Sequence, residues 1–162
     1  MKLFNRKGFT LIELLVVIAV LGVLAAAVIT AINPLGKINA AKDANVKSDI
    51  SGIASALQSY YTGQNPSAPA YPLLAAGLDD LKITGEVKVI PNQQTPAPAC
   101  AASPNGYTTG TDYCYVVTAT GDQAAVWGNT ASSGTNFWCW DSTNAVFKNS
   151  ATAPTLLAPT CP

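Results

Sequence analysis

The stretch Phe9–Ile32, FTLIELLVVIAVLGVLAAAVITAI, decides the fold of this 162-residue chain. Its only charged residue is Glu13. As a helix it would be about 36 Å long, and the hydrocarbon core of a bilayer is about 30 Å thick, so the stretch is predicted to span a membrane. A carboxylate near the bilayer centre costs about 2.5–3.5 kcal/mol, so Glu13 needs a functional explanation.

Basic residues cluster ahead of this stretch. Lys2, Arg6 and Lys7 lie within the first eight residues, whereas the chain from Phe9 onward has six basic and nine acidic residues. Because basic flanks stay on the cytoplasmic side, the C-terminal body is expected outside. The excess of acidic residues disfavours phosphate contacts with DNA or anionic lipid, so no nucleic acid partner is expected.

Two ordinary explanations of an apolar N-terminus compete here. A secretory signal peptide would have the basic start and would be cleaved after Ala25-Ala26-Ala27, an A-x-A site. Its apolar region is usually about 7–15 residues long, which is shorter than this stretch. Neither a discarded peptide nor a plain single-span anchor has a use for Glu13.

The residues Lys7-Gly8-Phe9-Thr10-Leu11-Ile12-Glu13 resemble the processing motif of type IV prepilins and type II secretion pseudopilins. The resemblance is close over 7–27, looser through the following helix, and beyond that limited to the general layout. In that family a prepilin peptidase cuts after the glycine and methylates the new N-terminal residue. The resemblance implies a cleaved leader at 1–8, cleavage between Gly8 and Phe9, and methylation of Phe9.

The resemblance also implies a role for Glu13 in assembly. Cleavage would leave a positive amine on Phe9, and in the family's assembly scheme Glu13 meets the amine of a neighbouring subunit. Removing one partner of a desolvated ion pair costs about 3–5 kcal/mol, so Glu13 is predicted to set the register between subunits. The implied partners are other copies of the chain in a helical polymer, the prepilin peptidase, an assembly platform and a cytoplasmic ATPase.

A helix break is predicted between Gly22 and Pro34. A proline inside a helix removes a hydrogen bond and usually kinks the helix. By resemblance, the segment between such a glycine and proline loses its helical hydrogen bonds in many filaments of the family, whose usual proline lies where this chain has Thr30. The predicted division is a membrane and filament-core helix at 9–33 and an amphipathic helix at 34–62.

Apolar residues recur at steps of four and three in the second helix, which is helical spacing. They are Val46, Ile50, Ile53, Leu57 and Tyr60. The charged residues of the other face are Lys42, Asp43, Lys47 and Asp49. The apolar stripe is predicted to pack on a sheet of the same chain, because the rival, a coiled coil, would have only two heptads. The helix should end near Thr62-Gly63.

Residues 63–162 are expected to form a β-rich head, which makes the fold class α+β. The elements expected in chain order are a helix at 73–81 and strands at 86–90, 113–119, 123–128, 136–140 and 144–148. Turn-sized connections between the last four strands favour an antiparallel meander. The tail after residue 148 is expected to be extended.

Four cysteines lie in the head. An even number beyond a membrane segment favours an oxidising compartment and two disulfides. Of the three possible pairings we prefer Cys100–Cys114 with Cys139–Cys161, because each bond then joins an irregular segment to a strand. Many pilins have a disulfide near the C-terminus, which supports a bond there without fixing these partners.

No catalytic activity, cofactor or metal is expected. The chain lacks histidine, the commonest general base and zinc ligand, and has no group that would activate a serine or threonine. Major pseudopilins of type II secretion bind calcium, but no D-x-D-x-D-G loop is present here. Acidic residues that could supply oxygen ligands are Asp79, Asp80, Asp112, Asp122 and Asp141.

The sequence is therefore interpreted as a structural, pilin-like subunit. Before assembly it would sit in the bacterial cytoplasmic membrane with its head outside, and afterwards in an extracellular pilus. The alternatives are a pseudopilin of a type II secretion system and a minor or competence pilin involved in DNA uptake. The presence of Glu13 argues against a tip subunit, and the disulfide-rich head favours a surface pilus.

Overall fold

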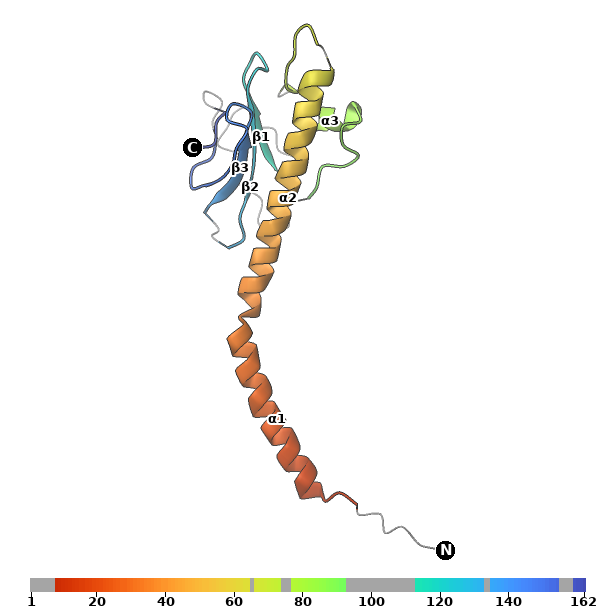
Figure 1. Ribbon diagram of the computed structural model, residues 1–162, viewed down its shortest axis with the longest axis vertical. Helices are drawn as coiled ribbons and strands as arrows, with labels where there is room; N and C mark the ends of the chain where they lie inside the picture. Colours follow the sequence, from red (N-terminus) through yellow and green to blue (C-terminus); the bar gives the residue numbers. More distant parts are fainter. Residues whose placement is uncertain (1–7, 65, 74–76, 93–112, 133–134, 155–158) are drawn as a thin grey trace, which may run out of the picture. The chain divides into compact units, whose positions relative to one another are not determined.

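The computed structural model describes residues 8–64, 66–73, 77–92, 113–132, 135–154 and 159–162. The chain divides into two compact units, Met1–Ile38 and Asn39–Pro162. In chain order the elements are α1 (Leu11–Ile32), α2 (Pro34–Gly63), α3 (Asp79–Ile83), β1 (Cys114–Val117), β2 (Ala124–Asn129), β3 (Phe137–Asp141) and β4 (Phe147–Ser150) (Figure 1). A long helical N-terminus and a four-stranded antiparallel sheet confirm the predicted α+β class.

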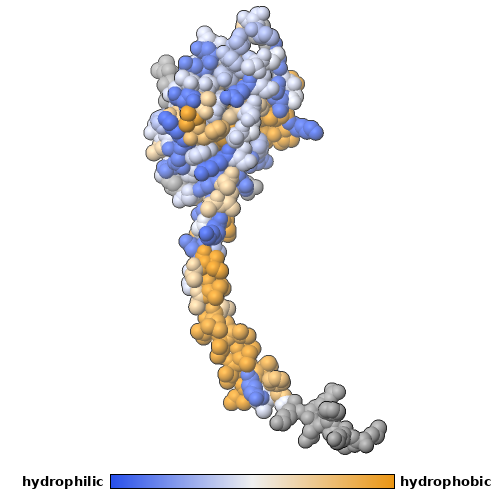
Figure 2. Space-filling model, viewed as in Figure 1, coloured by the Kyte–Doolittle hydropathy of each residue, from blue (hydrophilic) through white to orange (hydrophobic). Residues whose placement is uncertain are grey.

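The first unit contains α1, an apolar helix without a buried residue. Hydrophobic side chains cover it (Figure 2), and each of its large ones is at least 53% exposed. Its 22 residues give a length of about 33 Å. By length and composition, this is the helix of the described chain that is suited to crossing a membrane.

The break between α1 and α2 falls on one residue, Asn33. Its backbone is left-handed, with φ 47° and ψ 68°, a conformation that asparagine tolerates better than most residues. Its side-chain Oδ1 accepts a hydrogen bond from the backbone N of Gly36 at 3.3 Å. Pro34 is the first residue of α2, a position where the missing N–H breaks no hydrogen bond.

The predicted break at Gly22 is not present in this single chain. Gly22 lies in the middle of α1, which is helical throughout Leu11–Ile32. A side chain at this position would meet no atom within 4 Å, so the packing of the chain alone does not require glycine. Unwinding between Gly22 and Pro34 in a filament stays a prediction.

The sheet is an antiparallel meander in the order β1-β2-β3-β4, as predicted. The first three strands lie close to their predicted ranges, but β4 begins at Phe147 and not at 144. The preceding residues form a turn instead, because the backbone N of Asn144 donates to Asp141 Oδ1 at 2.7 Å and Ala145 has φ 52°.

Two predictions between α2 and β1 are wrong. Residues 86–90 do not form a strand, and the helix predicted at 73–81 is shorter, Asp79–Ile83, and begins later. Alternation would place Val87 and Val89 on one face of a strand. In the structure Val87 packs against the core, whereas Val89 is 73% exposed.

The second unit buries the apolar stripe of α2 against one face of the sheet, as predicted. Val46, Ile50, Ile53 and Leu57 are at most 1% exposed. They share a hydrophobic cluster with strand residues that include Tyr115, Val126 and Trp140. Burying one such side chain contributes about 1.5–3 kcal/mol, so this layer is the main source of the head's stability.

The other face of the sheet carries a second, smaller hydrophobic cluster. Its buried members are Cys114, Val116, Ala125, Trp127, Cys139 and Cys161. Because both faces are covered, all four residues of β1 are buried and its sequence shows no polar alternation. The C-terminal Cys161 is part of this second layer.

Charged side chains of α2 also bind the head. Each of three contacts joins one α2 residue to a different part of the head. The contacts are Asp43 Oδ1 with the backbone N of Ala131 (2.5 Å), Asp49 Oδ2 with the Tyr113 hydroxyl (2.7 Å), and Lys47 Nζ with the ring centroid of Trp138 (4.4 Å). These residues lie beside the apolar stripe and not opposite it, and their polar groups bind strands and loops of the head to the helix.

Candidate functional site

The predicted cleavage site lies directly ahead of α1. Gly8 and Phe9 precede the N-cap residue Thr10 and belong to no helix or strand. Both are exposed, Phe9 to 91%. A Cβ placed on Gly8 would meet no atom within 4 Å, so the folded chain does not itself require glycine there. Both residues are thus accessible from outside the folded chain, and cleavage between them stays a prediction.

Thr10 and Glu13 form a capping box at the start of α1. The backbone N of Thr10 donates to Glu13 Oε2 at 2.9 Å, and the Thr10 hydroxyl donates to the same oxygen at 2.7 Å. In return, the backbone N of Glu13 donates to Thr10 Oγ1 at 3.3 Å. The box satisfies N–H groups that the first helical turn leaves without a partner, which is valuable in lipid, where water cannot replace the missing acceptors.

We did not predict a role for Thr10 from the sequence. A threonine three residues ahead of a glutamate, before an apolar run, is the signature of a capping box and would have revealed the role. The structure therefore gives Glu13 a function inside its own chain, in addition to the assembly role implied by the resemblance.

The capping box leaves one oxygen of the Glu13 carboxylate available. Among the described residues, the hydrogen bonds to this carboxylate go to Oε2. The N-terminal end of the helix dipole favours a negative charge at this position. Glu13 is consequently held by one oxygen and can offer Oε1 to a cation or donor from outside the chain.

The other residues predicted for assembly lie away from this turn. Pro34 follows the break at Asn33, and Gly22 lies within α1. The basic leader residues Lys2, Arg6 and Lys7 lie outside the described residues, so their role stays a prediction. The structure thus brings together Phe9, Thr10 and Glu13 at one end of an apolar helix.

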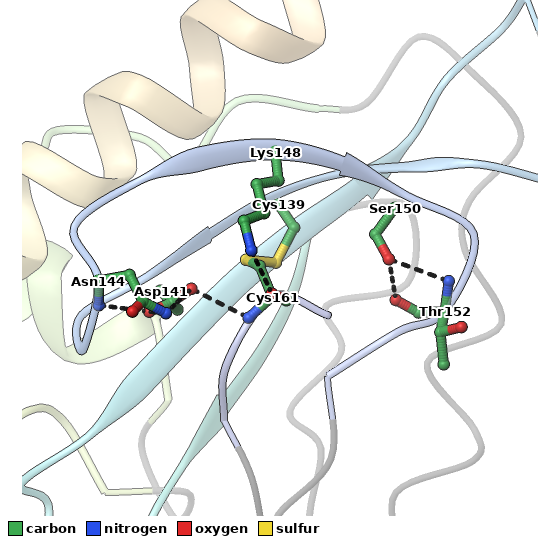
Figure 3. The surroundings of a disulfide bond; sticks show 7 residues. All are labelled: Cys139, Asp141, Asn144, Lys148, Ser150, Thr152 and Cys161. Carbon is green, nitrogen blue, oxygen red and sulfur yellow. Dashed lines mark hydrogen bonds between the residues drawn. A yellow bond between two sulfur atoms is a disulfide. The ribbon is translucent and has the colours of Figure 1, made fainter.

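A disulfide joins Cys139 of β3 to Cys161, with the two Cα atoms 5.9 Å apart (Figure 3). This is one of the two bonds preferred from the sequence. The other, Cys100–Cys114, involves Cys100, which lies outside the described residues, so that pairing stays a prediction.

The aspartates considered as calcium ligands are engaged with protein groups where the structure describes them; Asp112 lies outside that part. The partners are Lys82 for Asp79, Tyr60 for Asp80, Thr118 and Thr120 for Asp122, and Asn144 and Cys161 for Asp141. Hydrogen bonds from the two threonine hydroxyls hold the pKa of Asp122 below its usual value. Within the described part of the chain, no group of three or more His, Cys, Asp or Glu residues is arranged to hold a metal.

Comparison with known proteins gives two matches. Residues 3–29 match the family described as the prokaryotic N-terminal methylation motif. The chain is also 39% identical, over 77 residues, to the type II secretion system core protein G of Pseudomonas aeruginosa. The match covers 48% of this chain and 50% of that protein, so the chain spans about half the length of this relative. No solved structure matches. The two matches confirm the resemblance drawn from Lys7–Glu13.

Proposed function

Because its N-terminal segment is a prepilin-type methylation motif, we propose that this chain is a structural subunit of a type IV pilus-like filament. One observation carries the proposal: an exposed, non-helical Gly8–Phe9 bond leads directly into a capped apolar helix with a carboxylate in its first turn. A transmembrane anchor needs the helix, but it needs neither the open bond nor the acid.

Processing would occur in the membrane. A prepilin peptidase would cleave between Gly8 and Phe9, remove the basic leader and methylate the new Phe9 amine. Thr10 would then be the second residue of the mature chain, and its hydrogen bonds to Glu13 involve no atom of the leader. The capping box would therefore survive cleavage and keep Glu13 in place beside the new N-terminus.

Assembly would exchange one apolar environment for another. The helix α1 buries no residue within its own chain, so lipid or the helices of other subunits must cover it. Moving between these environments changes apolar exposure to water little. The position that a subunit takes would then depend on polar contacts. A neighbour's Phe9 amine paired with Glu13 Oε1 would supply one, since an unpaired partner costs about 3–5 kcal/mol.

This function implies a location and further partners. The subunit would wait in the cytoplasmic membrane with its N-terminus inside and its head outside, and would end in an extracellular pilus. An assembly platform and a cytoplasmic ATPase would drive the insertion of subunits. The basic residues before Phe9 support the orientation.

Two substitutions separate the charge of Glu13 from its hydrogen bonds. Glu13→Gln keeps a side chain that can complete the capping box but removes the charge, whereas Thr10→Ala removes the cap and keeps the charge. We expect Glu13→Gln to abolish filaments. Thr10→Ala should only lower their yield, because losing a cap costs about 0.5–2 kcal/mol.

The measurement is electron microscopy of shed fibres, with peptide identification, in a strain that lacks other pilins. Immunoblots of the membrane fraction control for the amount of each variant. Normal fibre yield from the Glu13→Gln variant would show that the charge does not set the register between subunits. The role of Glu13 would then be limited to capping α1.

A second candidate is a pseudopilin of a type II secretion system, favoured by the 39% identity to core protein G. Deletion of the gene distinguishes the two, because a pilin mutant loses surface fibres and keeps protein secretion, whereas a pseudopilin mutant loses secretion. A competence pilin involved in DNA uptake is a third candidate, and binding of DNA to the purified full chain in a gel-shift assay would support it.

A further inference from the structure

Cys161, near the end of the chain, is held at three points (Figure 3). Its sulfur is bonded to Cys139. Its backbone N donates to Asp141 Oδ2 at 3.0 Å, in a buried hydrogen bond. Its carbonyl oxygen accepts from Lys148 Nζ at 3.3 Å. Two of the three connections are therefore independent of the disulfide.

The three residues that hold Cys161 lie on one face of the β3–β4 pair. Cys139 is directly opposite Lys148 in the strand register, and directly opposite residues share a face. Asp141 is two residues after Cys139 on β3, which places it on the same face. A thiol, a carboxylate and an ammonium group thus converge on the side chain, N–H and carbonyl of one residue.

Burial of the Asp141 carboxylate favours its hydrogen bond to Cys161. Its side chain is 0% exposed, and a buried carboxylate is costly unless hydrogen bonds replace its water. Asn144 donates to Oδ1 from its backbone N at 2.7 Å and from its side chain at 3.1 Å. The Cys161 N–H donates to Oδ2 at 3.0 Å, and the Asn144 side chain also reaches Oδ2, at 3.3 Å. The carboxylate therefore gains from holding Cys161 whether or not the two sulfurs are joined.

The sheet also restricts which cysteine can reach Cys139. Cys114 faces Trp127, and Trp127 faces Cys139, so the two cysteines are two strands apart. With about 4.8 Å between neighbouring strands, their Cα atoms are about 10 Å apart. A disulfide needs less than about 7 Å, so the formed sheet forbids a Cys114–Cys139 bond.

We propose that Asp141 is a positioning residue for disulfide formation. In the reduced chain it binds the N–H of Cys161 and, with Lys148 on the carbonyl, holds the Cys161 thiol beside Cys139. The folded head then directs oxidation to the Cys139–Cys161 pair. This inference does not depend on the filament function.

The oxidation proceeds by two exchanges with a small-molecule disulfide such as oxidised glutathione. The thiolate of Cys139 or Cys161 first attacks the reagent, forming a mixed disulfide and releasing one glutathione thiolate. The second protein thiolate attacks the protein sulfur of the mixed disulfide, closes the Cys139–Cys161 bond and releases the second glutathione thiolate. The two cysteines lose two electrons to the reagent, and their two protons pass to solvent. Positioning accelerates the second exchange, which is intramolecular.

The first test measures the rate of ring closure. The reduced full chain, folded in detergent micelles, is mixed with oxidised glutathione, quenched with acid, alkylated and analysed by peptide mass mapping for the 139–161 pair. Asp141→Asn has the same size but loses the charge and one acceptor, so we expect closure about tenfold slower or more. Lys148→Met, at an exposed residue, should slow it about two- to threefold. The matched control Asp122→Asn, in an exposed turn, should close at the normal rate.

The second test asks whether the tail is held before the bond exists. In the full chain with Cys139→Ala and Cys161→Ala, we expect the amide of residue 161 to be protected from hydrogen exchange. Adding Asp141→Asn should speed exchange at residue 161 and leave the amide of Val126, in the central strand β2, unchanged.

Several results would overturn the proposal. In the first test, normal ring closure in the Asp141→Asn variant contradicts it. In the second test, hydrogen exchange at residue 161 of the cysteine-free chain at the rate of an unstructured chain contradicts it. So does an equal acceleration of exchange at residue 161 and Val126 by Asp141→Asn, because that would indicate a general loss of stability. If the Asp141→Asn variant does not fold, the Lys148→Met variant tests the proposal instead. An unchanged rate of ring closure together with unchanged protection of the residue 161 amide in that variant would contradict the proposal.

Discussion

Glu13 in α1 and Asp141 in the head are both carboxylates in apolar surroundings, but the chain treats them differently. Glu13 lies on a helix without a buried residue and uses one oxygen within its own chain. Asp141 is fully buried, and both of its oxygens accept hydrogen bonds from the head. The head supplies hydrogen bonds to both oxygens of its buried acid, whereas α1 leaves its acid and its apolar side chains exposed in the single chain.

The same contrast holds for the apolar residues. Ile50 of α2 is 0% exposed, in a core made by its own chain, and Ile18 of α1 is 61% exposed. One sequence therefore contains a unit with a hydrophobic core of its own and a helix whose apolar side chains are exposed in the single chain. The two regions should respond differently to the same change.

Matched truncations should show the largest difference. Ile50→Ala removes a buried side chain and leaves a cavity, so we expect the head to lose about 2–5 kcal/mol of its free energy of unfolding. Ile18→Ala should leave that free energy unchanged. Denaturant unfolding of the full chain in micelles, followed by near-UV circular dichroism, measures both. A comparable loss from Ile18→Ala would contradict the independence of the head.

Removal of the Cys139–Cys161 disulfide should be the next largest effect. The bond spans a sequence separation of 22 residues, and a loop of this size corresponds to about 3 kcal/mol in the chain-entropy treatment. We expect the double substitution Cys139→Ala and Cys161→Ala to lower the head's free energy of unfolding by about that amount. The far-UV helical signal of α1 should persist after the head has unfolded. Simultaneous loss of both signals would show that α1 depends on the head.

Alkaline pH should weaken the head and leave α1 helical. Burial raises the pKa of Tyr115, whose hydroxyl donates to the carbonyl of Pro72 at 2.8 Å. The folded head then keeps a phenolic proton that the unfolded chain loses above about pH 10, so the stabilisation is complete below that pH and is lost as the pH rises. The expected slope is at most about 1.4 kcal/mol per pH unit.

Unfolding of the unsubstituted chain and of the Tyr115→Phe variant between about pH 9 and pH 11 measures this effect. The substitution should flatten the decline without abolishing it, because desolvation also raises the pKa of Tyr60 and Tyr71. The helix α1 contains no tyrosine and serves as the internal reference. An identical decline in both chains would remove Tyr115 as its cause.

The smallest expected effect is a gain in stability. Ala145 has φ 52° in the β3–β4 turn, a conformation that costs a residue with a Cβ atom about 1–2 kcal/mol. Ala145→Gly relieves this cost but adds flexibility to the unfolded chain, so we expect a net gain of about 0.5–1 kcal/mol in the head. Unchanged or lower stability in thermal unfolding would contradict this explanation of the turn.

Local features of the chain were easier to predict from the sequence than contacts between distant residues. The apolar run of α1 and the buried stripe of α2 follow from composition and helical spacing, which are local properties. The antiparallel meander followed from alternating runs and short turns. The prediction of a strand at 86–90 was wrong because a strand forms only beside a partner strand. The presence of a partner cannot be inferred from the alternating residues alone.

Contacts between distant residues were the main omission. The sequence pattern assigned Asp43 and Asp49 to the polar face of an amphipathic helix. In the structure, Asp43 binds Ala131 and Asp49 binds Tyr113, both far along the chain. The delayed start of β4 depends on a turn that Asp141 stabilises through its side chain. The role of Thr10 was the exception, because its capping box is local and could have been predicted.

The most direct test of the account is the mass of the N-terminal peptide of the protein isolated from its native membrane or filament. A prepilin-type subunit is expected to begin at Phe9 and to carry a methyl group on the amine. A chain beginning at Val28 would indicate a secretory signal peptide, and one beginning at Met1 a plain anchor. Either of these two results would contradict the proposed function.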